Sequence, residues 1–556
     1  MEYILVIAAI MAAIVIWSIF NNKKNKMQLK DRLKDEWGET PTEEYSSEKM
    51  EYLKSYYNSV KDNNLDVDDI TWNDLDMDEI YMEMNNTNSS IGEEYLYALL
   101  RKPCFSEEEL QERNRLMKFF TDHTEKRVEL QTRLHNMGKL RSISVFEYIN
   151  RLEAQEADSN LIHYLLDLGF LLSIALIFVN PGLGGVGTFA FAIINIFHYY
   201  SCRAKIENYI MVFSYILRLL DNTKAIIRLD IPEIKEYIGR LREDIRHFNK
   251  IKRGSFILAP KNANGNIVDA ILDYFRMLFH LDLIKYNSML SFFKKNRKVL
   301  NRIFENLGYL DSMLAAASFR KLIYYYCEPE LTKSEKPILS AKDLYHPLLE
   351  QPVTNSITES RSVLLTGSNA SGKSTFIKTL AINAILSQTI YTATATSYQG
   401  SYFMIYSSMA LRDNIFSSES YYIVEIKSLK RILDHIRPDI PMLCFIDEVL
   451  RGTNTLERIA ASSRILNTLA LENALVYAAT HDIELTHILE KNFSNYHFQE
   501  RIEDNQVLFD YKLHQGKAIS KNAIKLLAML GYPGEITASA EQAAQDFLSS
   551  GEWSNL

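Results

Sequence analysis

Eight residues in the C-terminal third of the chain, Gly367 to Ser374, read GSNASGKS and have the composition of a phosphate-binding loop. The apolar residues VLL precede this loop and the run TFIKTLAINAILSQ follows it, which is the strand, loop and helix order that such a loop requires. Glycine lets the backbone wrap around phosphate oxygens, and the amide groups at the start of the helix attract the anion. Lys373 is placed to reach the β- and γ-phosphates, and Ser374 to ligate Mg²⁺. The predicted nucleotide contacts are Gly367, Ser368, Asn369, Ala370, Ser371, Gly372, Lys373, Ser374 and Thr375.

Two adjacent carboxylates, Asp447 and Glu448, follow a second apolar segment that has the pattern of a buried strand. The first can hold Mg²⁺ through water, and the second can orient the water that attacks the γ-phosphate. A further apolar segment, Ala474 to Ala479, is followed by His481, from which an imidazole can sense that phosphate. Adjacent carboxylates after a strand favour a hydrolase over a kinase. The predicted catalytic residues are Lys373, Glu448 and His481, and the predicted metal ligands are Ser374 and Asp447.

The elements that must position these residues change in character after Pro337, where short apolar strands begin to alternate with helices. This alternation predicts an α/β domain with a mostly parallel sheet over residues 336–556. Over residues 86–335, apolar side chains instead recur at helical spacing. The sequence therefore predicts an α/β phosphate-binding-loop domain that follows an elongated all-α domain.

Composition places the chain near the globular average, with 47% hydrophobic and 24% charged residues among 556. A mainly disordered, collagen-like or fully membrane-buried protein is excluded, and the length favours several domains. The four cysteines form no CxxC pair, so they predict neither a disulfide framework nor a zinc module. Between Asp31 and Glu83 the chain has 17 acidic and 5 basic residues. We expect a solvated acidic neck over residues 27–85, which leaves the rest of the chain net basic.

Residues 1–26 have the pattern of a membrane anchor. The 18 residues from Tyr3 to Phe20 carry no charge, which is close to the length of a membrane-spanning helix. Lys23, Lys24 and Lys26 follow directly, so the positive-inside rule places the N-terminus outside the cell membrane and the rest of the chain in the cytoplasm.

A second apolar region over residues 161–199 is split by the turn-like residues Asn180 to Gly185, which predicts two helices joined as a hairpin. Basic residues flank the region and its turn has no charge, so a membrane hairpin would keep both flanks in the cytoplasm. The first arm contains His163 and Asp167, and its apolar part is short for a membrane span. A buried or re-entrant helix pair is therefore the alternative.

Four segments in order resemble the ATPase domain of the MutS family, an ABC-type ATPase. These segments are TGSNASGKSTFIKT, SESYYIVE, FIDEVLRGTNT and ATHDIEL. Further blocks agree: YHPLLE before the first strand, SKNAIKLLAMLGYP near the end, and NNTNSSIGEEYLYALLRKP, which resembles the start of the MutS core or lever domain. The resemblance extends over roughly residues 85–540 and is strongest from residue 345 onward.

The resemblance implies ATP and Mg²⁺ as cofactors and a homodimer of ATPase domains. Ser420 and Glu425 align with the family's signature segment, which faces the nucleotide of the partner subunit, so two composite sites would form across the interface. Asn369 matches the family's phosphate-loop asparagine, and Arg451 to Thr455 match its D-loop. The chain departs from the family where Ser368 replaces a proline.

Mismatch-reading members of the family carry an N-terminal domain with a Phe-x-Glu motif and then a connector domain. Residues 21–84, between the anchor and the helical domain, are too few for these domains. The string occurs at residues 105–107 and 498–500, where we interpret it as chance because both lie inside or beside other matched blocks. No nuclease-like segment is expected after residue 540.

DNA contact would then involve the helical domain, where basic residues cluster at 240–253 and 294–302. A solvated surface or one near anionic lipid is an equal interpretation of these clusters. We expect a membrane-anchored MutS-family ATPase whose hydrolysis at the dimer interface is coupled to DNA binding, with mismatch repair as the family role. The alternative is an ATP-driven membrane scaffold or remodelling protein without a DNA ligand. An ABC transporter fits less well, since no LSGGQ string occurs.

Overall fold

The computed structural model describes most of the chain, namely residues 17, 20–21, 23–155, 159–252, 267–334, 336–368, 371–409, 421–503, 506–518, 524, 527, 531–551 and 553. The membrane-anchor prediction falls almost wholly on residues outside this description. The chain folds into two compact units, here called the helical unit and the ATPase unit. The helical unit consists of Met1–Lys61, Tyr81–Leu99 and Glu112–Leu322. The ATPase unit consists of Asp62–Ile80, Leu100–Gln111 and Ile323–Leu556.

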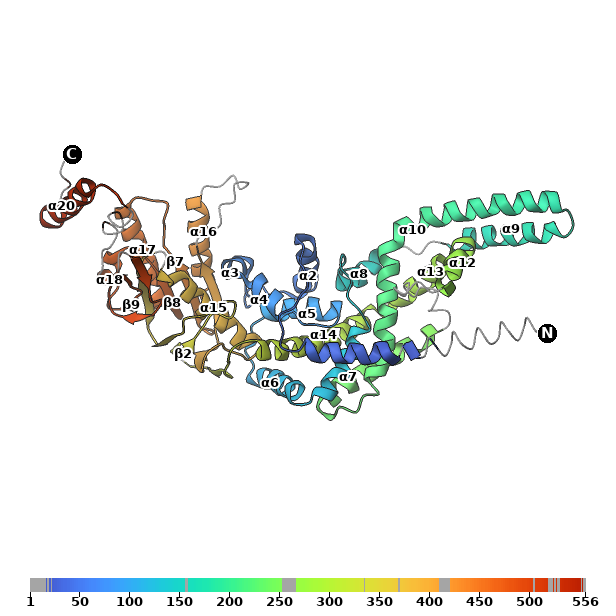
Figure 1. The fold of residues 1–556 in the computed structure, drawn as a ribbon, viewed down its shortest axis with the longest axis horizontal. Coiled ribbons are helices and arrows are strands. Elements are labelled where there is room, and N and C mark those ends of the chain that lie inside the picture. Colours follow the sequence, from blue (N-terminus) through green and yellow to red (C-terminus); the bar gives the residue numbers. More distant parts are fainter. Residues whose placement is uncertain are drawn as a thin grey trace. The chain divides into compact units, whose positions relative to one another are not determined.

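The helical unit confirms the helical pattern predicted for the middle of the chain (Figure 1). Its helices and those shared with the ATPase unit are α2 (Ser47–Val60), α4 (Met77–Met84), α5 (Ser90–Arg101), α6 (Glu107–Asp122), α7 (Thr124–His135), α8 (Val145–Arg151), α9 (Leu161–Ile177), α10 (Pro181–Ile226), α11 (Lys235–Ile245), α12 (Ile267–Phe279), α13 (Leu281–Lys295) and α14 (Arg297–Leu322). The core is rich in aromatic rings, and Tyr56 packs against both Phe146 and Phe304. Serine caps begin two of these helices, since Ser46 and Ser144 accept bonds from backbone amides at the start of α2 and α8.

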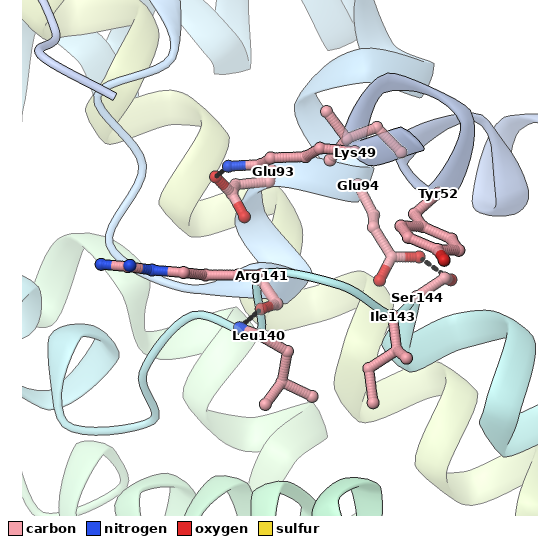
Figure 2. Close-up of a pocket in the computed structure, with 10 residues that line it drawn as sticks. Lys49, Tyr52, Glu93, Glu94, Leu140, Arg141, Ile143 and Ser144 are labelled. Atoms are coloured by element: carbon pink, nitrogen blue, oxygen red, sulfur yellow. Dashed lines mark hydrogen bonds and ion pairs between the residues drawn. The ribbon is translucent and has the colours of Figure 1, made fainter. Parts of the chain in front are cut away.

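A polar group of side chains is buried inside this unit (Figure 2). Lys49 on α2 and Glu93 on α5 form an ion pair of 3.1 Å, and both side chains are nearly inaccessible to solvent. Beside them, Glu94 accepts a hydrogen bond of 2.7 Å from the Ser144 hydroxyl. Burying such groups is tolerated because each finds a partner within the unit.

Helices α9 and α10 form the hairpin predicted over residues 161–199 (Figure 1). Asn180 begins α10 by accepting a bond of 3.2 Å from the Leu183 amide. Gly184 allows the two helices to approach closely, because a side chain there would lie 2.3 Å from the backbone nitrogen of Ile177. Among the described residues, α10 is the one helix long and apolar enough to cross a membrane, and α9 is a shorter apolar helix.

The ATPase unit contains the mostly parallel sheet that the sequence predicted. The six strands have the order β12-β9-β4-β8-β7-β6, and all neighbouring pairs are parallel except β12 with β9. Their bounds are β4 (Ser362–Thr366), β6 (Met404–Ser408), β7 (Met442–Asp447), β8 (Ala474–Ala479), β9 (Phe493–His497) and β12 (His514–Gln515). The helices of the unit beyond residue 323 are α15 (Lys373–Thr389), α16 (Tyr421–Asp434), α17 (Thr455–Leu471), α18 (Ile483–Ile488) and α20 (Gly534–Ser550).

Two smaller sheets complete this unit. One has the order β1-β5-β2-β3, and the other is the antiparallel pair of β10 with β11. Their bounds are β1 (Glu330–Thr332), β2 (Leu339–Leu344), β3 (Asn355–Glu359), β5 (Ser397–Ser401), β10 (Glu500–Glu503) and β11 (Gln506–Phe509). The prediction of an α/β domain in this part of the chain is therefore confirmed.

The solvated acidic neck expected over residues 27–85 is not what the structure shows. Residues 62–80 form part of the ATPase unit, with a short helix α3 (Asp69–Asp74) whose Trp72 is only 1% exposed. Residues 47–60 form α2 of the helical unit, with Leu53 and Tyr57 buried. The expectation was wrong because it counted charges and gave too little weight to the aromatic and aliphatic residues between them, which supply a buried face.

Candidate active site

Three neighbouring parallel strands bring the predicted site residues to one edge of the sheet. Ala479, at the end of β8, pairs with Leu365 at the end of β4 and with Asp447 at the end of β7. Because parallel strands point the same way, the segments that follow β4, β7 and β8 all leave the same edge. These segments carry the phosphate-binding loop, Glu448 and His481 respectively. Crevices at the carboxyl ends of such strands are where α/β sheets bind their ligands.

The phosphate-binding loop follows β4 and leads directly into α15. Gly367 has a φ of 139°, and a side chain there would lie 2.6 Å from the Phe498 carbonyl oxygen, so the position requires glycine. Gly372, with a φ of 102°, begins α15 in a conformation that also favours glycine. Asn369 and Ala370 lie outside the described residues. Both glycines have backbone conformations that favour glycine and lie before a helix N-terminus, whereas their contact with phosphate stays a prediction.

Lys373 points its ammonium group back into this loop. The side chain is 2% exposed, and Nζ donates to the carbonyl oxygens of Gly367 and Ser368 at 2.6 and 2.7 Å. Burial lowers the pKa of Lys373 to about 8, although Asp447 and Glu448 act to raise it. An ammonium held at the centre of the loop is in position to donate to phosphate oxygens bound there.

Two side chains, His481 and Arg451, hold Glu448 at the end of β7. Its backbone has a φ of 59°, and its amide donates to the Ala479 carbonyl at 3.0 Å. His481 Nε2 lies 2.9 Å from one carboxylate oxygen, and the Arg451 guanidinium pairs with the other. Burial acts to raise the pKa of Glu448, but the hydrogen bonds from His481 and Arg451 outweigh it and lower the pKa below its ordinary value. The carboxylate is therefore ionised and oriented, as a group that accepts a proton from water must be.

Asp447 and Ser374 are the predicted ligands of Mg²⁺. Asp447 is half-buried at the end of β7, and Ser374 lies half-buried in the first turn of α15. Within the described ranges, no group of three or more His, Cys, Asp or Glu side chains is arranged to hold a metal ion. A Mg²⁺ ion that takes most of its oxygen ligands from phosphate and water needs only one carboxylate and one hydroxyl from the protein. The residues present therefore fit Mg²⁺ held jointly by protein and nucleotide.

Glu425 on α16 holds the backbone that follows Glu448. The side chain is 7% exposed, and its carboxylate accepts bonds from the amides of Leu450 and Arg451. Burial raises the pKa of Glu425, in opposition to these bonds. Ser420 lies outside the described residues, so its predicted place near a partner's nucleotide stays a prediction.

Two residues near the loop were not singled out by sequence reasoning. Glu500 accepts a bond of 2.6 Å from the Ser368 hydroxyl, and the ring of Tyr511 lies against Gly372. Glu500 belongs to one of the two Phe-x-Glu strings, which places that string in the ATPase unit, beside the nucleotide loop. Both residues lie more than 120 positions after the loop in the sequence, so no short pattern predicts these contacts. The parallel pairing of β9 with β4 brings Glu500, which lies just after β9, to the loop.

Comparison with known proteins points to one family. A family model described as MutS domain V matches residues 363–548. The DNA mismatch repair protein MSH3 of Debaryomyces hansenii is 28% identical over 295 residues, which cover 48% of this chain and 28% of that protein. The DNA mismatch repair protein MutS of Thermotoga maritima is 28% identical over 262 residues, covering 45% and 32%. MutS protein homolog 4 of Homo sapiens is 29% identical over 286 residues, covering 48% and 30%, so the matched stretches span less than a third of each relative.

Proposed function

Because the chain belongs to the MutS family, with the ATPase domain in its C-terminal region, we propose that it binds ATP with Mg²⁺ and hydrolyses it. The observation that carries this proposal is the meeting of Lys373, Glu448 and His481 at one edge of a parallel sheet. Phosphoryl transfer needs a cationic cradle for the β- and γ-phosphates and a base that orients the nucleophile. Both requirements are met by described side chains of this unit.

Each residue has a defined part in the proposed reaction. The loop amides and the Lys373 ammonium hold the phosphates and neutralise charge that develops on the γ-phosphate. Glu448 orients a water molecule and accepts its proton as the water oxygen bonds to phosphorus and the bond to the β-phosphate oxygen breaks. His481 and Arg451 keep the Glu448 carboxylate in place. Mg²⁺ on Asp447 and Ser374 supplies further charge neutralisation when bound.

The active form in this proposal is a homodimer with two composite nucleotide sites. Ser420 and Glu425 lie in the segment that the resemblance places against the nucleotide of the partner subunit. Replacement of Ser420 by alanine is expected to weaken the ATP-stabilised dimer, while a single chain still binds nucleotide. Sedimentation of the Glu448→Gln protein with ATP, with and without Ser420→Ala, measures this. An unchanged dimer would contradict the composite site.

DNA is the ligand that we propose to be coupled to the ATP cycle, since the relatives named above are called DNA mismatch repair proteins. Contact would be through the helical unit and independent of base sequence. Several basic side chains of the two expected clusters are already engaged inside that unit. Arg297 pairs with Glu153, and Arg302 donates to Asp244 at 3.0 Å. These pairs reduce the positive charge that is available to bind the phosphates of DNA. They therefore favour the second candidate function.

That second candidate is an ATPase that works on a membrane without DNA, and the hairpin α9–α10 supports it. Apolar side chains point outward over its length, with Phe178 88% exposed and Phe197 78% exposed. The side chains buried in the hairpin include the polar residues His163, Ser173 and Asn195. An apolar exterior over a polar interior suits lipid surroundings and is unfavourable in water. We therefore propose that the hairpin inserts into the cell membrane, with residues 1–26 as a second anchor and the ATPase unit in the cytoplasm.

One experiment tests the proposal and separates its two forms. The full-length protein is placed in lipid nanodiscs, and ATP turnover is measured without DNA, with homoduplex DNA and with mismatched or branched DNA, each at two salt concentrations. Stimulation that weakens with salt would establish a DNA-coupled ATPase, and a preference among the DNAs would assign the structure recognised. Normal basal turnover without a response to DNA would favour the membrane ATPase. No turnover under any condition would refute both.

A further inference from the structure

Residues 62–80, here called the brace, pack along the edge strand β6 although they lie more than 320 residues before it in the chain. The brace contains α3, and its Leu65 packs against the apolar core of the six-stranded sheet. The Thr71 hydroxyl accepts a hydrogen bond of 3.0 Å from the Ser407 amide of β6. An edge strand presents unpaired amides, and the brace covers one of them.

Asp74 of the brace binds the point where β6 ends. One carboxylate oxygen accepts a bond of 2.6 Å from the Ser407 hydroxyl and another of 2.9 Å from the Met409 amide. Burial raises the pKa of Asp74, while these two bonds act to lower it. A half-buried carboxylate with two short bonds to one strand end fixes that end in place.

Two further carboxylates of the brace bind cations on the helices that flank the nucleotide site. Asp68 pairs with Arg431 of α16 at 2.6 Å, and Arg431 also donates to the Ser407 carbonyl. Asp76 pairs at 2.6 Å with Lys378 of α15, the helix that begins with Lys373. The brace therefore holds α16, β6 and α15 together.

A continuous set of described contacts leads from the brace to Glu448. Arg431 and Glu425 lie on the same helix, and Glu425 holds the amides of Leu450 and Arg451. Arg451 in turn pairs with the Glu448 carboxylate. A shift of α16 along its axis would thus move the backbone that presents the proposed base.

We propose that the brace is a positioning element for the nucleotide site, in which Asp68 and Asp74 set the place of α16 and the end of β6 and thereby the loop that orients Glu448. The inference rests on the proposed ATP hydrolysis. Helix α4 begins in the brace and ends in the helical unit. The brace therefore connects the helical unit covalently to the ATPase unit.

The test uses full-length protein with Asp68→Asn or Asp74→Asn. Turnover at saturating ATP is expected to fall by about 10- to 100-fold, because small displacements of catalytic groups have effects of this size, while the affinity for ATP stays unchanged. The double variant Asp68→Arg with Arg431→Asp restores the ion pair with reversed charges but not the bond from Arg431 to the Ser407 carbonyl, so it is expected to recover part of the turnover. The control is Asp434→Asn, which removes an exposed pair with Lys430 on the same helix and is expected to change nothing.

A second readout does not depend on catalysis. Hydrogen–deuterium exchange at the amides of Leu450 and Arg451 is expected to become faster in both variants without nucleotide, since Glu425 no longer holds them firmly. If exchange and turnover are unchanged and only the melting temperature falls, the brace merely stabilises the unit and the inference is wrong. If the unsubstituted protein does not hydrolyse ATP but exchange is faster in the variants, the proposed hydrolysis is wrong. The positioning of Leu450 and Arg451 by the brace is then still supported. If the Asp74→Asn protein does not fold, the same two measurements on Asp68→Asn test the inference.

Discussion

Two carboxylates, Glu448 of the ATPase unit and Glu94 of the helical unit, are held in opposite ways. Glu448 is half-buried, and hydrogen bonds from His481 and Arg451 lower its pKa. Glu94 of the helical unit is fully buried, and its described partners are the Ser144 hydroxyl and backbone amides. Burial raises the pKa of Glu94 to about 8. The hydrogen bonds to Glu448 favour its ionised form, whereas burial favours the neutral form of Glu94.

The two units also differ in where their apolar side chains lie. In the ATPase unit every residue of β8 is buried, and the polar groups gather at the strand ends. In the helical unit, Asp167 of the hairpin lies 3.0 Å from the fully buried His280 before α13, while Phe178 and Phe197 of the hairpin face outward. The strand of the ATPase unit thus keeps its apolar side chains inside, as suits a protein in water. The hairpin of the helical unit instead places apolar side chains outside and polar ones inside, as suits lipid.

The largest effect is expected from Glu448→Gln. Glutamine keeps an oxygen for His481 but cannot accept a proton, so hydrolysis is expected to fall by about 10²- to 10⁴-fold while ATP binding is retained. Single-turnover hydrolysis and equilibrium nucleotide binding measure the two properties separately. The control is Glu472→Gln, an exposed carboxylate at the end of α17. Unchanged turnover in the Glu448 variant would remove this residue from the role of base.

The nucleotide site was predictable because its residues are local in sequence. Eight consecutive residues define the loop, and Asp447 and Glu448 follow directly on a strand, so short patterns were enough. The role of Glu425 was not predictable, because its bonds to Leu450 and Arg451 depend on how α16 packs. The brace was also missed. Its carboxylates find Arg431 and Lys378 far along the chain, and charge counted along a sequence does not reveal such pairs.

An intermediate effect is expected from placing a charge on the hairpin. Val179→Cys, labelled with an environment-sensitive fluorophore, is expected to shift its emission to the blue in liposomes, as Val179 is 82% exposed beside the turn. Adding Leu172→Arg, on the exposed apolar surface of α9, is expected to lower insertion about 100-fold, since an arginine at the centre of a membrane helix costs about 3 kcal/mol.

The control for the hairpin is the same label at Ile488, an exposed residue of α18 in the ATPase unit. Its emission is expected to be the same with and without lipid. The unsubstituted protein gives the background from the four native cysteines. If the label at position 179 behaves like the label at position 488, the hairpin does not enter lipid, and the contrast between the two units would concern polar groups only.

The smallest effect is expected from Glu94→Gln and concerns stability against pH. Because the pKa of Glu94 is raised in the folded state, its neutral form favours folding. Its contribution is complete below the pKa of the unfolded chain and is lost as pH rises towards 8. The unfolding free energy is therefore expected to decrease between pH 5 and 8 by about 1 kcal/mol per pH unit from this group. Glu94→Gln should remove that slope, while Glu48→Gln, at an exposed site on α2, should leave it. Denaturant unfolding at several pH values measures both, and identical slopes in the two variants would show that Glu94 is ionised in the folded protein, as Glu448 is.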